Sequence, residues 1–142
     1  MPTHTKILSY QNEAGLITIS RTATTAELSQ NVEVEVATGA TVAEIDLSIP
    51  ASTLKSIAFG VTKKTGQASA LVAGPLTLKS NSSSEPDDTI VVKTTNGVMW
   101  AFGDDATANP KPINTTVTKF YVANPGDGIA ILVIKILNDP TP

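Results

Sequence analysis

The chain of 142 residues has a formal net charge of −3, no cysteine and a single histidine. A chain without cysteine has no disulfide scaffold, no thiolate zinc site, no iron–sulfur cluster and no cysteine nucleophile. One histidine, His4, is too little for a multi-histidine metal site or a nucleophile–base pair, so we expect neither an enzyme nor a cofactor. The basic residues form no stripe, and the longest apolar run, 128–134, is too short for a membrane helix. We therefore expect no nucleic-acid partner and no membrane partner.

Short segments rich in Val, Ile and Thr, separated by Gly and Pro, predict an all-β chain, because β-branched residues suit strands. The spacing predicts a single-domain antiparallel β-sandwich or jelly roll over residues 7–138. We expect an N-terminal arm over 1–6 and a C-terminal tail over 139–142. In chain order the predicted strands are Ile7–Tyr10, Leu16–Arg21, Val32–Ala37, Val42–Ile49, Ile57–Thr62, Ser69–Val72, Leu76–Lys79, Thr89–Thr94, Val98–Phe102, Val117–Ala123 and Ile129–Leu137.

The third and fourth predicted strands alternate cleanly, with apolar residues on one face and acidic residues on the other. A hairpin turn at Thr38-Gly39 places Glu33 opposite Glu44, and it keeps the apolar residues of both strands on one buried side. This register gathers four carboxylates on one solvent face: Glu33, Glu35, Glu44 and Asp46.

Like charges opposite each other destabilise a sheet unless something neutralises them. The acidic face is therefore interpreted in three ways: a solvated face that resists aggregation, a docking surface for basic residues of a partner, or a cation site. We add His4 and Lys6, from the expected arm, to the predicted partner interface.

Further along the chain, Asn96-Gly97 predicts a second hairpin. Val98, Trp100 and Phe102 share a face by alternation, which predicts an aromatic cluster in the core. The last predicted strand is apolar on both faces up to Lys135, as in a central strand or one covered by a partner chain.

Two groups of residues leave alternatives open. The fifth predicted strand has a face of unusually small residues, which permits close approach of a second sheet or subunit but also fits a plain sheet surface. The loops carry several aspartates, which either build turns or bind calcium. The aspartates are Asp87, Asp88, Asp104, Asp105 and Asp127, and the small residues are Ser56, Ala58, Gly60 and Thr62.

Several segments from Ile45 onward resemble small virion-associated proteins of tailed bacteriophages. The segments are Ser48–Ile57 (SIPASTLKSI), Leu76–Ile90 (LTLKSNSSSEPDDTI), Val98–Asp104 (VMWAFGD) and Phe120–Pro142 (FYVANPGDGIAILVIKILNDPTP). They are turn and strand segments without catalytic signatures. The resemblance implies a β-sandwich or jelly-roll domain with a capsid decoration (cement) role.

We therefore expect a non-enzymatic structural protein of the virion, made in the bacterial host cytoplasm. Its expected partners are the major capsid protein, or another virion protein, and further copies of itself in a homotrimer. Two alternatives remain: a carbohydrate- or calcium-binding β-sandwich module that uses the Asp-rich loops, and a secreted pilus or surface-layer subunit.

Overall fold

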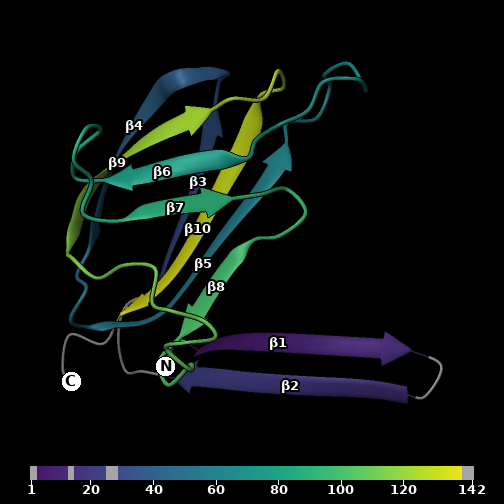
Figure 1. Ribbon diagram of the computed structural model, residues 1–142, viewed down its shortest axis with the longest axis vertical. Coiled ribbons are helices and arrows are strands. Elements are labelled where there is room, and N and C mark those ends of the chain that lie inside the picture. Colours follow the sequence, from purple (N-terminus) through teal and green to yellow (C-terminus); the bar gives the residue numbers. More distant parts are fainter. Residues whose placement is uncertain (1–2, 13–14, 25–28, 139–142) are drawn as a thin grey trace.

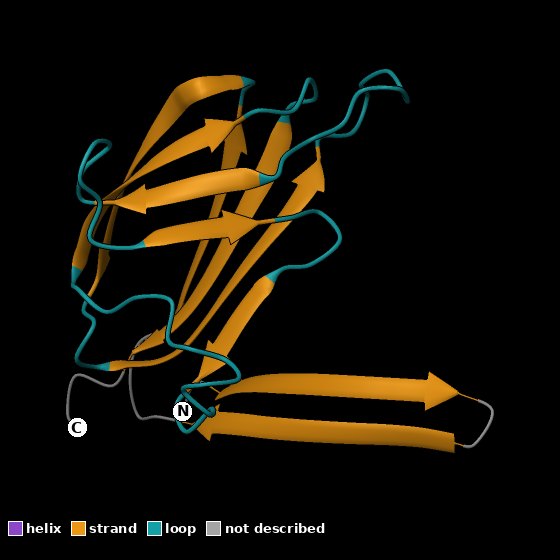
Figure 2. Cartoon of the chain, viewed as in Figure 1, coloured by secondary structure: helices purple, strands orange, loops and turns teal. Residues whose placement is uncertain are grey.

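The computed structural model describes residues 3–12, 15–24 and 29–138, and Figure 2 shows them as strands and loops. Within these ranges, no helix has the length and apolar character needed to cross a bilayer. The strands are β1 (Thr3–Asn12), β2 (Gly15–Thr24), β3 (Ser29–Val36), β4 (Gly39–Ile49), β5 (Leu54–Lys63), β6 (Leu76–Ser80), β7 (Thr89–Val92), β8 (Val98–Ala101), β9 (Val117–Asn124) and β10 (Ala130–Asn138).

The strands β3 to β10 form two four-stranded antiparallel sheets that pack together as a β-sandwich, which confirms the predicted fold class. One sheet has the order β3-β10-β5-β8 and the other has the order β4-β9-β6-β7. The pairing is nested: β3 pairs with β10, β4 with β9, β5 with β8, and β6 with β7. The chain is thus one long hairpin, rolled so that its paired strands fall alternately in the two sheets (Figure 1).

The core lies between the two sheets and is almost entirely aliphatic. The rings of Phe59, from β5, and Phe120, from β9, meet edge to face across it, with centroids 6.1 Å apart. Burial of such side chains is the main favourable contribution to folding. The largest fully buried side chains are Phe59, Phe120, Ile49, Ile57, Leu76, Leu78, Ile113, Leu132, Ile134, Ile136, Leu137 and Val36.

The predicted strands all form, except Ser69–Val72. That segment belongs to a loop, in which the amide of Leu71 donates to the carbonyl of Ala68 at 3.1 Å. Its last residue, Val72, meets the turn before β10 and not a strand. The carbonyl of Val72 accepts from the amide of Gly128 at 2.8 Å, and its amide donates to Asp127 Oδ1 at 2.6 Å. An apolar run of this length is not sufficient for a strand when no strand lies beside it.

The hairpin predicted at Thr38-Gly39 is wrong, because β3 and β4 lie in different sheets. The chain crosses from one sheet to the other there, and Gly39 takes a φ of 146°, which suits glycine. Each strand still buries one face, because the two apolar faces meet across the sandwich and not side by side. Alternation is satisfied equally by both arrangements, so it does not distinguish them.

The hairpin predicted at Asn96-Gly97 is also wrong, because this segment connects β7 in one sheet to β8 in the other. Gly97 is needed here for space. A Cβ at this position would lie 2.7 Å from the carbonyl oxygen of Phe59, which is closer than side chains approach. Gly97 therefore marks a place where two backbone segments approach closely, and not a two-residue hairpin turn.

A buried asparagine closes one end of the sandwich. Asn124 is the last residue of β9 and is completely buried. Its Oδ1 accepts from the amides of Gly74 and Gly126, each at 3.1 Å. Its Nδ2 donates to the carbonyls of Val36 at 3.3 Å and Gly128 at 3.0 Å. One side chain thus joins the end of β3, the segment before β6 and the turn before β10.

The β1–β2 hairpin stands apart from the sandwich. Its strands pair in register from Thr3 opposite Thr24 to Asn12 opposite Gly15. Figure 1 shows the hairpin leaving the sandwich beside β8, which both strands approach, and extending away from it. Residues 3–6 of the expected arm form the first part of β1, whereas residues 1–2 and the expected tail over 139–142 lie outside the described residues.

Replacing Asn124 with Ala leaves four backbone groups without their partner, and three of the lost hydrogen bonds are buried. An unsatisfied buried group costs about 1–3 kcal/mol, and water can reach some of these groups once the site loosens. We therefore expect Asn124→Ala to lower the free energy of unfolding by about 2–4 kcal/mol, measured by urea denaturation. Asn96→Ala, at an exposed position, is the matched control and should change it by less than about 0.5 kcal/mol. Equal effects of the two variants would contradict this role for Asn124.

Candidate functional site

The predicted acidic face does not exist as one surface, because its carboxylates lie on two sheets. Glu33 and Glu35 belong to β3, where Glu33 stands opposite Val133 of β10. Glu44 and Asp46 belong to β4, opposite Tyr121 and Lys119 of β9. The predicted pairing of Glu33 with Glu44 is therefore wrong, for the same reason as the predicted hairpin. The carboxylates instead form one pair on the outer face of each sheet.

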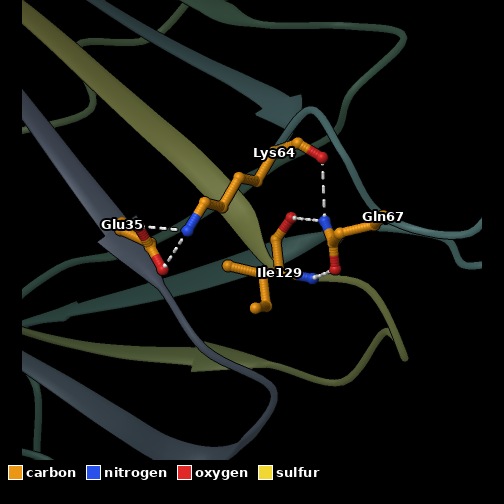
Figure 3. A network of polar contacts seen from close by, with 4 residues as sticks. All are labelled: Glu35, Lys64, Gln67 and Ile129. Carbon is orange, nitrogen blue, oxygen red and sulfur yellow. Dashed lines mark hydrogen bonds and ion pairs between the residues drawn. The ribbon is translucent and has the colours of Figure 1, made fainter.

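On the first sheet, Glu35 is neutralised by a lysine of the same chain (Figure 3). Lys64 Nζ lies 3.0 Å from both carboxylate oxygens of Glu35. Gln67 holds the same loop, since its Nε2 donates to the carbonyls of Lys64 at 3.0 Å and Ile129 at 2.8 Å. Its Oε1 accepts from the amide of Ile129 at 2.8 Å. Glu33, by contrast, is exposed and has no ion pair among the described residues.

On the second sheet, Glu44 and Asp46 share one cation. Lys119 Nζ lies 3.2 Å from Glu44 Oε2 and 3.7 Å from Asp46 Oδ1, and 5.8 Å from the ring centroid of Tyr121. The carboxylates are 58% and 87% exposed. The hydrogen bond to Glu44 raises the pKa of Lys119, and the charges of Glu44, Tyr121 and Asp46 act in the same direction. The cluster keeps one uncompensated negative charge at neutral pH.

The predicted aromatic cluster is correct for Trp100 and wrong for Phe102. Trp100 is 8% exposed and packs in the core, whereas Phe102 is 63% exposed. Strand β8 ends at Ala101, so the alternation that would turn Phe102 inward stops before it reaches that residue. Lys55 Nζ lies 4.2 Å from the ring centroid of Phe102, and Lys111 Nζ lies 5.3 Å from that of Trp100.

Lys111 is the more enclosed of these two cations. Its Nζ donates to the carbonyl of Ala51 at 2.5 Å. Burial lowers its pKa, and the negative charge of Asp88 opposes that effect. The side chain of Lys111 thus brings its cation over the ring of Trp100 from the loop that precedes β9.

The aspartates of the loops bind the protein's own amides. Asp88 Oδ2 accepts from the amides of Asn114 at 2.9 Å and Thr115 at 3.3 Å, and so joins two loops. Asp105 Oδ1 accepts from the amide of Thr107 at 2.7 Å within its own turn. The bond of Asp105 matches the turn-building interpretation, whereas Asp88 reaches residues far away in the sequence. Among the residues that the structure describes, no group of three or more His, Cys, Asp or Glu side chains is placed to hold a metal ion.

His4 and Lys6 lie in β1, opposite Ala23 and Arg21 respectively. Their side chains lie outside the part of the structure that is described, so their predicted partner role stays a prediction.

Sequence reasoning missed Asn124 and the Lys64–Gln67 network. A buried side chain with four backbone partners, such as that of Asn124, leaves no periodic signal in the sequence. Gln67 likewise stands in a polar loop that looks like any other solvated connection.

Comparison of the chain with protein-family models, with curated proteins and with solved structures found no match.

The ion pair of Lys119 makes a testable contribution at alkaline pH. Since the pKa is raised in the folded state, the contribution is fully present below the ordinary lysine pKa and disappears as the pH rises through the raised value. We expect the thermal midpoint of the wild-type protein to exceed that of Lys119→Gln at pH 8, and the difference to vanish at strongly alkaline pH. A difference that persists unchanged there would contradict the ion-pair explanation.

Trp100 and Phe102 provide a matched pair for the core boundary. Trp100→Ala should lower the free energy of unfolding by about 3–5 kcal/mol, because it removes a large buried side chain. Phe102→Ala removes only an exposed ring and a cation contact, so a loss of about 1 kcal/mol or less is expected. Chemical denaturation measures both, and comparable losses would place Phe102 in the core after all.

Proposed function

We propose that this chain is a non-enzymatic structural protein of a bacteriophage virion, a capsid decoration protein made in the host cytoplasm. It binds the major capsid protein and stabilises the head lattice as a homotrimer. The observation that supports this best is the hairpin β1–β2, which projects beyond a small sandwich (Figure 1). A projecting ribbon provides a second contact in addition to the sandwich surface, as an assembly protein needs.

We infer that the sandwich is a jelly roll, since its eight strands pair in nested fashion across two four-stranded sheets. Jelly rolls occur in viral capsid proteins, but also in lectins and cupins, and a fold alone does not define a function. The proposal therefore depends on the projecting hairpin and on the resemblance of the segments after Ile45 to phage virion proteins.

The mechanism is burial of modest interfaces that symmetry repeats many times. A trimer that contacts a lattice through three equivalent surfaces binds far more tightly than one subunit does, because the later contacts are intramolecular. Glu44 and Asp46 carry more negative charge than Lys119 neutralises, so we propose that they dock basic residues of the capsid protein.

Binding to heads tests the role directly. The purified protein should co-sediment saturably with heads of the tailed phage that carries this gene. Reversing the patch with Glu44→Lys and Asp46→Lys should weaken binding about tenfold or more, which corresponds to about 1.4 kcal/mol. The triple variant Glu85→Lys, Thr95→Lys and Asn96→Lys, at exposed loop residues, adds the same positive charge and is the control for net charge. Absence of wild-type binding would overturn the proposal, and equal weakening by the control would remove the patch from it.

Solution mass with and without calcium separates this role from a calcium- or carbohydrate-binding module. Light scattering should show a trimer that is indifferent to calcium. A monomer whose thermal midpoint rises with calcium and falls again with EDTA would contradict the proposal and support the binding module.

A further inference from the structure

The outer face of the sheet β3-β10-β5-β8 carries an apolar strip along its second strand. In β10, Leu132 and Ile134 are buried in the core, so Ile131 and Val133 face outward, and both are only partly covered. We call this surface the β10 face and define it by one list. The residues are Glu33 and Glu35 of β3, Ile131, Val133 and Lys135 of β10, Ala58 and Gly60 of β5, and Met99 of β8.

Gly60 lies in the middle of this face, and the subunit itself gives no reason for a glycine there. A Cβ at Gly60 would meet no atom within 4 Å, and its φ is not among the positive values of the described chain. Glycine inside a strand weakens the strand, and it often marks a place where another backbone approaches closely. Gly97 shows the contrast, because there the subunit's own Phe59 fills the space.

The β1–β2 hairpin is a ribbon without a complete partner in its own subunit. A hairpin of two strands is marginally stable in water unless it packs on something else. In its register, Leu8 stands opposite Ile19 and Tyr10 opposite Ile17, and alternation places these two pairs on one face of the ribbon. The hairpin extends away from its own sandwich (Figure 1), so it does not cover its own β10 face.

Charge indicates which surface the ribbon fits. Lys6 stands directly opposite Arg21, next to the pair of Leu8 and Ile19, and like charges opposite each other need a neutralising group. The strands β1 and β2 contain no Asp or Glu. On the β10 face, Glu33 is exposed, stands opposite Val133 and has no ion pair among the described residues. By register, the ribbon thus has apolar residue pairs next to two basic residues, and the β10 face has partly covered apolar residues next to Glu33.

We propose that the β1–β2 hairpin of one copy of this chain packs on the β10 face of a second copy. The apolar pairs of the ribbon lie over Val133 and Gly60, and Lys6 and Arg21 lie beside Glu33. This contact is heterologous, since two different surfaces meet, and repetition around an axis closes a ring. The inference specifies the contact between copies in the proposed trimer, whereas head binding is a separate property measured separately.

Replacement of Gly60 gives effects of opposite sign on the subunit and on the assembly. Gly60→Val fills open space with a residue that favours strands, so the subunit should lose no stability in urea denaturation. The same side chain blocks the ribbon, so light scattering should show monomers where the wild-type protein is oligomeric. Thr89→Val, exposed on the other sheet, should leave the oligomer intact. An oligomer that survives Gly60→Val would overturn the proposal.

Cross-linking between differently marked copies tests the contact itself. Because the chain has no cysteine, each introduced thiol is unique. A mixture of Tyr10→Cys and Val133→Cys chains, treated with a short bis-maleimide, should yield the mixed dimer. Ser9→Cys, on the opposite face of the ribbon by alternation, should yield at least fivefold less. Equal yields, no mixed dimer, or a wild-type protein that is monomeric at all concentrations would each overturn the proposal, whatever the result with phage heads.

Discussion

The hydrogen bonds of Asn124 hold together the end of the sandwich at which the chain crosses most often between sheets. Its amide reaches the end of β3, the segment before β6 and the turn before β10, which belong to both sheets. A side chain with two donors and an acceptor satisfies groups that no strand ladder reaches. Gly126 lies at the same junction. A Cβ at this position would lie 2.4 Å from the carbonyl oxygen of Val72. This junction lies at the end of the ladder that pairs the first strand of the sandwich with its last.

The strands could be predicted from the sequence, whereas their partners could not. A period of two identifies the buried faces of the two alternating strands, and Val36, Ile45 and Ile49 are buried as it predicts. It does not identify which strand lies alongside, since a neighbour in the same sheet and a strand in the facing sheet cover that face equally well. Glu33 and Glu44 were therefore predicted opposite each other although they lie on separate sheets. The prediction that Phe102 is buried was wrong for a local reason, because β8 ends one residue before it.

The two faces of β10 now have separate explanations. Its inward residues form the centre of the core, and its position between β3 and β5 accounts for its generally apolar character, as the sequence suggested for a central strand. Its outward residues, Ile131 and Val133, lie between small residues of β5 and the carboxylates of β3. A surface that is partly apolar and acidic at its border suits another protein chain better than a small ligand.

The nested pairing also determines when this protein can fold. Strand β3 finds its partner about a hundred residues later in the sequence, in β10, and β4 finds its partner in β9. While a ribosome synthesises the chain, β3 and β4 remain unpaired until β9 and β10 have emerged from the exit tunnel. Within the sandwich, the pair β6–β7 at the tip of the long hairpin is complete first, and the separate β1–β2 hairpin is complete before it. Charged side chains disfavour the joining of unpaired strand edges, and both β3 and β4 carry acidic residues.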